Sequence, residues 1–160
     1  EEKAKKISEQ PIWIKGIGQK TTSASFTKNI FEEITSTKIA AELAYKMADI
    51  EPELIDVAEV HDAFSVCELM AISELGFTTD DKSGKFVRDL FNTENRMINP
   101  RGGLIGAGHP LGATGISQTI EITNQLQGKA EKRQISNVKT GLIHNMSAAG
   151  TSSSVMVLKN

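Results

Sequence analysis

The distribution of apolar and polar residues predicts strands and helices that alternate along the first half of the chain. Apolar residues alternate over residues 12–18, which predicts a strand ending in glycine. Residues 19–35 are rich in Ser and Thr and are expected to form a long connection. Over residues 38–50 the apolar positions follow a helical period, and Pro52 ends it. The residues expected to face inward are Ile39, Ala40, Leu43, Ala44 and Met47.

A second strand is predicted over residues 55–60 and a second helix from residue 65 to Gly76. Ser65 and Glu68 have the spacing of a capping box, in which the hydroxyl and the carboxylate each accept a hydrogen bond from a backbone N–H at the start of the helix. Residues 77–98 are polar and irregular, and we expect a long loop there.

The last part of the chain predicts one helix and a hairpin. The helix covers residues 112–127, with Gly128 ending it and Ile116, Ile120 and Leu126 expected to face inward. Residues 138–144 and 153–159 read as two strands around a turn of small residues. The order of these elements predicts an α/β fold with a mixed sheet.

Composition and charge narrow the function classes. The net charge of −2 argues against a nucleic-acid or anionic-membrane partner, and no apolar run approaches the ~20 residues of a membrane helix. A single cysteine, Cys67, cannot form an internal disulfide, which fits a reducing cytoplasm. No signal peptide is visible, but residue 1 is Glu rather than Met, which leaves open a fragment, a processed piece or a truncated form of a longer chain.

Glycine and histidine mark the candidate chemistry. Residues 99–115 hold six of the 13 glycines and the pair His109-Pro110. Proline suits the first turn of a helix, so His109 is expected where a loop becomes a helix N-terminus. The glycine spacing resembles a dinucleotide fingerprint, but the acidic residue expected ~20 residues later at the end of a second strand is missing.

Each of the three histidines ends a predicted element. The ligand crevice of an open α/β sheet lies beyond the carboxyl ends of its strands, so His61 and His109 are expected to face one another. Cys67, His109 and Asn145 follow the chain order of a cysteine hydrolase, although Cys67 is better explained as an inert thiol within a helix. The ligand spacing does not favour a metal site, and Asp62 is expected to cap the following helix.

Three motifs resemble those of the C-terminal half of thiolases. They are Val-His-Asp-Ala-Phe at residues 60–64, the glycine-rich run with Gly-His-Pro-Leu-Gly at 102–115, and Gly-Leu-Ile-His-Asn at 141–145. The resemblance is strongest to archaeal acetyl-CoA acetyltransferases and to the sterol-carrier-protein type of thiolase. It implies one half of a thiolase fold, a mixed five-stranded sheet flanked by helices, over residues 1–160.

The resemblance also implies a reaction, the reversible Claisen condensation of acyl-CoA thioesters. The nucleophilic cysteine of such enzymes lies in an N-terminal half that these residues do not contain. By resemblance, His109 activates that cysteine and helps bind the thioester oxyanion, and His61 completes the oxyanion hole directly or through water. Phe64 would pack against the pantetheine arm, and the remaining positions expected to bind substrate are Gly108, Asn145 and Ser147.

Two departures from the family bear on the second acid/base. Many thiolases carry Cys-x-Gly in the last hairpin, where this chain has Asn145-Met146-Ser147, followed by Ala148 in place of a further glycine. Some sterol-carrier-type enzymes supply that cysteine at the position of Ala63. The identity of this acid/base, and with it full thiolase competence, therefore stays open.

The expected partners follow from the same resemblance. They are an N-terminal thiolase half in the same chain or a separate subunit, further copies of the complete unit, and a small zinc-ribbon and OB-fold protein. Coenzyme A thioesters are expected as substrates, with no cofactor and no metal. Two alternatives remain, a thiolase-like retro-aldolase acting on CoA thioesters and a non-catalytic scaffold subunit, although a scaffold has no need of His61 and His109.

Overall fold

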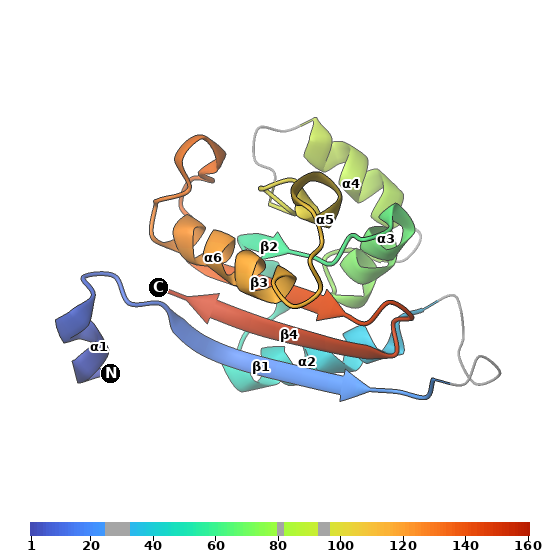
Figure 1. The fold of residues 1–160 in the computed structure, drawn as a ribbon, viewed down its shortest axis with the longest axis horizontal. Helices are drawn as coiled ribbons and strands as arrows, with labels where there is room; N and C mark the ends of the chain where they lie inside the picture. The colour runs from blue at the N-terminus through green and yellow to red at the C-terminus, as the bar shows by residue number, and fades with distance from the viewer. Residues whose placement is uncertain (25–32, 80–81, 93–96) are drawn as a thin grey trace.

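A four-stranded mixed sheet forms the centre of the computed structural model, which describes residues 1–24, 33–79, 82–92 and 97–160 (Figure 1). Its strands lie in the order β1-β4-β3-β2. Both pairs that contain β4 are antiparallel, whereas β2 runs parallel to β3. The strands are β1 (Trp13–Thr21), β2 (Val57–Glu59), β3 (Thr140–Met146) and β4 (Ser152–Lys159).

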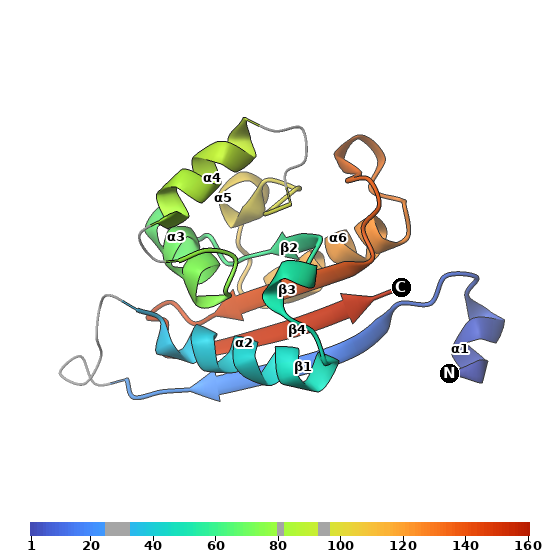
Figure 2. The ribbon, with the colours of Figure 1, turned by 180° about the vertical axis from the view of Figure 1, so that it is seen from behind.

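Helices cover both faces of this sheet. Helix α2 packs on β1 and β4, and α6 lies on the opposite face over β2 and β3, as the two views show (Figures 1 and 2). The helices are α1 (Glu2–Ile7), α2 (Thr35–Ala48), α3 (Ser65–Glu74), α4 (Ser83–Phe91), α5 (Gly103–Ala107) and α6 (Thr114–Leu126), with short 3-10 turns at Pro52–Leu54 and Glu131–Arg133. None of the helices in the described parts of the chain is long and apolar enough to cross a membrane.

The mixed α/β architecture is confirmed, but the expectation of five strands is wrong for the residues described. The fifth position is reduced to one parallel bridge, in which Ile98 pairs with Ala58 beside β2. Asn99 then takes a left-handed conformation (φ 50°), and the Gly102 N–H donates to the Asn99 carbonyl oxygen. The chain therefore turns away from the sheet directly after the bridge.

Helix α2 lies unusually close to β1, which corrects its predicted orientation. A Cβ atom on Gly18 would overlap the carbonyl oxygen of Ala40, and one on Gly16 would overlap that of Ala44. Because the two backbones are so close, only alanine-sized side chains of α2 fit between the helix and β1. Ala40 and Ala44 take these buried positions. Leu43 and Met47, expected to face inward, lie on the outer face with 46% and 64% of their surface exposed.

Helix α6 departs from its predicted orientation for a different reason. Ile116 and Ile120 are exposed, and of the three residues expected to face inward only Leu126 is buried. The buried face carries polar side chains that have fixed hydrogen-bond partners, which is the condition under which polar groups can be buried. These residues are Gln118, Glu121 and Gln125, bonded to the His144 carbonyl oxygen, to Arg133 and to the Ile135 N–H respectively.

Two further expectations are wrong. The segment 77–98 contains helix α4, whose apolar residues Phe86, Val87 and Leu90 pack against the core on the α2 side of the sheet. The capping box is also not formed, because α3 already includes Ser65 and the Glu68 carboxylate accepts a hydrogen bond from the Asn99 side-chain amide instead. Part of the connection predicted at 19–35, residues 25–32, lies outside the described residues.

Candidate functional site

His61 lies at the end of β2, where its side chain meets β3. Its ring is almost completely buried, and its Nδ1 lies 2.8 Å from the Asn145 side-chain oxygen. An oxygen beside Nδ1 accepts a hydrogen bond, so Nδ1 carries the proton in the neutral ring. Nε2 is then the nitrogen that can accept a proton or a hydrogen bond.

His109 lies in the connection between α5 and α6. Its Nδ1 is 2.7 Å from the Thr114 hydroxyl, which itself donates to the Pro110 carbonyl oxygen. The hydroxyl therefore accepts from Nδ1–H, and Nε2 of His109 is again the free base. The expected placement is corrected here, because α6 begins at Thr114 and a turn separates it from His109. A threonine side chain, rather than a proline joint, orients the ring.

The two histidines expected to face one another lie edge to face, with ring centroids 4.9 Å apart and an interplanar angle of 87°. Both line a cavity of about 620 Å³. The wall around them is mainly apolar and includes Phe64, two residues of α5 and one residue of the turn after it. The other lining residues are Ala63, Leu104, Ile105, Leu111, Asn145, Met146, Ser147 and Ala148.

Burial keeps His61 neutral. Desolvation lowers the pKa of His61, the hydrogen bond to Asn145 opposes this shift, and the charge of a protonated His109 nearby lowers the pKa further. A neutral imidazole with Nδ1–H already bonded presents Nε2 as an acceptor at physiological pH. The cavity thus contains two imidazole Nε2 atoms that can accept a hydrogen bond.

The glycine-rich segment is held to the end of β2 by a carboxylate. Asp62 Oδ1 accepts a hydrogen bond of 2.6 Å from the Leu104 N–H at the start of α5. Asp62 therefore caps α5 and not α3, which corrects its predicted role. A Cβ on Gly103 would overlap the Asp62 carboxylate, and Gly103 is also left-handed (φ 63°), so glycine is required there for two reasons.

A buried ion pair between Arg101 and Glu59 also holds the glycine-rich segment, just before α5. Arg101 Nε donates to Glu59 Oε2 at 2.8 Å, and the Glu59 side chain is fully buried. Burial raises the pKa of Glu59, while its hydrogen bond to Arg101 opposes that shift. Glu59 and Asp62 together fix the approach of residues 101–104 to the sheet, and so set the place where His109 enters the cavity.

His144 lies behind the cavity and does not line it. Its ring holds the end of β2 to α2 through hydrogen bonds, a structural role that the sequence did not predict. Its Nδ1 accepts from the His61 backbone N–H, and its Nε2–H donates to the Thr37 hydroxyl at 3.0 Å. From Thr37 the hydrogen bonds continue through Ser153 and Ser36 to the Gly150 carbonyl oxygen. Complete burial lowers the pKa of His144 to about 3.

The other positions expected to bind substrate differ in their surroundings. Phe64 is mostly exposed at the rim of the cavity. Ser147 lines the cavity, but its hydroxyl accepts from the Thr151 and Ser152 N–H groups and closes the β3–β4 turn. The Gly108 N–H donates to the Leu104 carbonyl oxygen at the end of α5, and Gly108 does not line the cavity. Their roles toward substrate stay predictions.

The structure does not assemble the cysteine-hydrolase set. Burial raises the pKa of Cys67, which disfavours a thiolate, and Cys67 does not line the cavity. His109 is bonded to Thr114 and Asn145 to His61 instead. Among the described residues, no three His, Cys, Asp or Glu side chains are grouped so that they could hold a metal ion.

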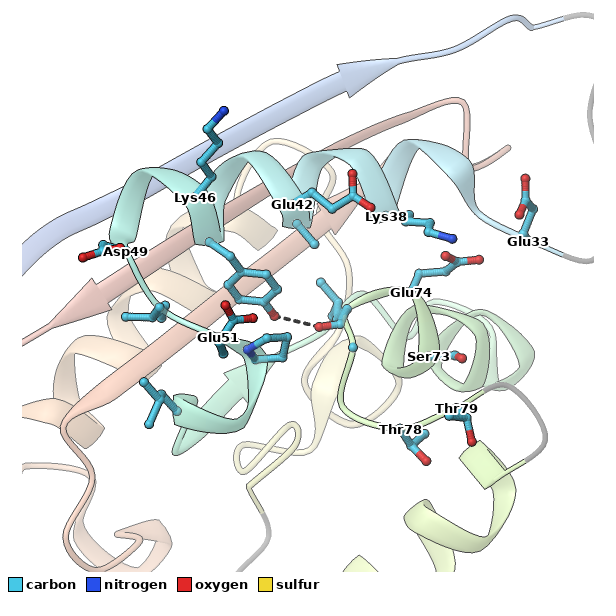
Figure 3. A pocket seen from close by; sticks show the side chains of 17 residues that line it. Glu33, Lys38, Glu42, Lys46, Asp49, Glu51, Ser73, Glu74, Thr78 and Thr79 are labelled. Atoms are coloured by element: carbon cyan, nitrogen blue, oxygen red, sulfur yellow. Dashed lines mark hydrogen bonds between the residues drawn. The ribbon is translucent and has the colours of Figure 1, made fainter.

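A second cavity, of about 840 Å³, lies between α2 and the C-terminal end of α3 (Figure 3). Its lining mixes acidic and basic side chains such as Glu42, Lys46 and Asp49, and the Tyr45 hydroxyl donates to the Leu75 carbonyl oxygen within it. None of the three histidines lines it. The paired imidazoles make the smaller cavity the candidate site.

A comparison with protein families shows to which family this chain belongs. A family model described as "Thiolase C-terminal domain-like" matches residues 16–160. The chain belongs to this family. The thiolase resemblance drawn from the three motifs is thereby confirmed, and the His61–His109 cavity lies within the thiolase C-terminal domain-like region.

Similar proteins include full-length enzymes. The chain is 37% identical to the acetyl-CoA acetyltransferase of Methanothermobacter thermautotrophicus over 157 residues, which is 96% of this chain and 41% of that protein. It is 40% identical to the Methanocaldococcus jannaschii acetyl-CoA acetyltransferase, covering 98% of this chain and 42% of that protein. Sterol carrier protein 2 of Bos taurus is 43% identical over 71% of this chain. The chain thus spans about two fifths of the length of these acetyltransferases.

A solved structure shares the fold. The chain named "Ltp2-ChsH2(DUF35) aldolase" superposes with a TM-score of 0.79, covering 94% of this thiolase-like chain and 40% of that one. At 21% sequence identity, this likeness shows the fold alone.

Proposed function

We propose that this chain supplies the C-terminal half of an acetyl-CoA acetyltransferase that performs reversible Claisen condensation of acyl-CoA thioesters. The observation that carries the proposal is the His61–His109 pair, with both Nδ1 protons engaged and both rings on one cavity. The names of the archaeal relatives support the transferase class. A scaffold subunit would have no use for a buried and a half-buried imidazole arranged in this way.

The chemistry assigns one task to each ring. Nε2 of His109 takes the thiol proton of a cysteine supplied by the N-terminal half, and the thiolate attacks the acetyl thioester carbonyl and displaces coenzyme A. The resulting imidazolium can donate to the oxyanion. Neutral His61 cannot donate through Nε2, so it accepts from a water molecule whose other hydrogen points to the oxyanion.

The substrate contacts follow from the cavity. Phe64 at the rim packs against the pantetheine arm, and Asn145 and Ser147 contact the thioester end, with Gly108 shaping the loop before His109. Coenzyme A thioesters are the substrates, and no further cofactor or metal takes part. The proposal extends to a cytoplasmic enzyme assembled from copies of the complete unit; association with a zinc-ribbon and OB-fold protein also stays a proposal.

Substitution of His109 tests the proposal. In the complete protein, His109→Ala should lower the rate of CoA-dependent cleavage of acetoacetyl-CoA by about 10²–10³-fold, the usual effect of removing an oxyanion donor. Lys38→Ala, in the second cavity, is the matched control and should leave the rate unchanged. A rate for His109→Ala within threefold of the control would refute the assignment.

Retro-aldol cleavage of a CoA thioester is the second candidate. Asn145 stands where many thiolases carry a cysteine acid/base, and an amide transfers no proton at neutral pH. A retro-aldolase needs no such cysteine, and the name of the similar solved structure is that of an aldolase. Release of an aldehyde or ketone from a 3-hydroxyacyl-CoA without consumption of free coenzyme A would favour this candidate over the transferase.

A further inference from the structure

Helix α6 carries a buried polar residue that none of the three motifs required. Gln118 is completely buried and belongs to α6, the helix that packs against β3 (Figure 1). Its Nε2 donates to the His144 backbone carbonyl oxygen at 3.2 Å, and its Oε1 accepts from Asn145 Nδ2 at 3.0 Å. Gln118 therefore bonds to two neighbouring residues of β3. They are His144, which lies behind the cavity, and Asn145, which bonds to the His61 ring.

The direction of these hydrogen bonds is fixed by the backbone. A carbonyl oxygen can only accept, so Gln118 must turn its NH₂ group toward His144 and its oxygen toward Asn145. Asn145 must then present its NH₂ group to Gln118, which leaves its oxygen facing His61 Nδ1 at 2.8 Å. An oxygen at Nδ1 keeps the proton there and leaves Nε2 as the acceptor.

We propose that Gln118 is a positioning residue that sets the tautomer of His61 through Asn145, using the His144 backbone carbonyl as its reference. The inference rests on the proposed function for its catalytic consequence, but not for the tautomer itself. Without Gln118 the Asn145 amide is free to rotate, and its NH₂ group would then face Nδ1 and place the proton on Nε2. His61 would no longer accept from the water that serves the oxyanion.

The test compares Gln118→Met with Gln125→Met in the complete protein. Gln125 is equally buried on the same helix, but it bonds to the segment around Arg133 and Ile135, away from the cavity. Gln118→Met should lower kcat for acetoacetyl-CoA cleavage about tenfold with little change in KM, because the hydrogen bond that orients the Asn145 amide is lost, whereas Gln125→Met should not. Equal kcat values in the two variants would overturn the proposal.

A double-mutant comparison separates positioning from a general loss of structure. In a His61→Ala background, Gln118→Met should no longer change kcat, because the ring it positions is absent. The same tenfold loss in both backgrounds would overturn the proposal.

A readout independent of activity completes the test. Hydrogen–deuterium exchange at the histidine C2 position, followed by mass spectrometry, reports the pKa of each ring. In Gln118→Met, loss of the Asn145 oxygen at Nδ1 should lower the pKa of His61. The other titratable groups that face His61 are His109, His144 and Asp62. An unchanged His61 pKa refutes the inference, while a lowered pKa in a protein without acyltransferase activity refutes only the proposed function.

Discussion

At the residue scale, His144 shows how burial determines protonation. Both of its ring nitrogens have partners within the fold, and its pKa is lowered to about 3, below the ordinary value of 6.5. Between these two pH values the unfolded chain binds a proton at this residue and the folded chain does not. The contribution of His144 to stability is therefore complete above pH 6.5 and is lost as the pH falls toward 3.

We therefore expect acid to destabilise the native protein more steeply than a His144→Gln variant. One proton corresponds to about 1.4 kcal/mol per pH unit, and the difference in slope between pH 6.0 and 4.5 should approach that value. Urea unfolding at several pH values measures it, with the exposed-site variant Lys38→Ala as the control. Parallel pH profiles for the native and His144→Gln proteins would show that His144 is not held neutral.

At the element scale, the contact between α2 and β1 determines the thickness of one layer. Glycine in the strand and alanine in the helix let the two backbones approach, so the larger apolar residues of α2 are turned outward. In α6, polar residues occupy the buried face, so Ile116 and Ile120 are likewise exposed on the outer face. In both helices the partner surface, rather than hydrophobicity, selects the buried face.

Gly18→Ala should lower the free energy of unfolding by about 1–3 kcal/mol, because the added methyl group forces α2 away from β1. Gly84→Ala is the matched control, since Gly84 lies in the first turn of α4 with open space around it and its substitution should change the free energy of unfolding by less than about 0.5 kcal/mol. Chemical unfolding of both variants measures the effect. A Gly18→Ala variant as stable as the native protein would contradict the close contact.

At the scale of the whole molecule, the exposed apolar residues and the open cavity are consistent with a missing neighbour. Leu43 and Met47 lie one turn apart on the outer face of α2, and Phe64 and Leu111 are exposed beside the cavity. The acetyltransferases similar to this chain are more than twice as long as the region they share with it. We expect the remaining part of such a protein to cover these surfaces and to bring the nucleophile to His109.

The 160 residues alone should therefore show no CoA-dependent cleavage of acetoacetyl-CoA, and addition of the N-terminal half should restore it. The control is the same N-terminal half with its nucleophilic cysteine changed to alanine, which should not restore the cleavage. Intact mass of the assayed species checks that the chain alone is present at 17.3 kDa. Full activity from that single species would contradict the requirement for a second half.

The sequence predicted the positions of most elements because local signals mark them. Alternating apolar residues predicted β1, the strand-like runs at 138–144 and 153–159 predicted the β3–β4 hairpin, and a helical period predicted α2. Helix α3 was predicted from Ser65, Glu68 and Gly76, and α6 from the residues before Gly128. Helix α4 was missed because polar residues surround its short apolar face, and the capping box failed because Asn99, distant in sequence, bonds to Glu68. The count of five strands came from the resemblance, and the left-handed turn at Asn99 ends the fifth after one bridge.

For the candidate site, the sequence by itself determined the family and the two histidines, because the motifs around His61 and His109 are contiguous in the chain. Only the tertiary structure decided how those rings are held. Thr114, Asn145 and Gln118 each act through a hydrogen bond whose direction depends on a third group, and no spacing along the chain encodes such a direction. Protonation at the site is therefore a property of the packed elements and not of the motifs.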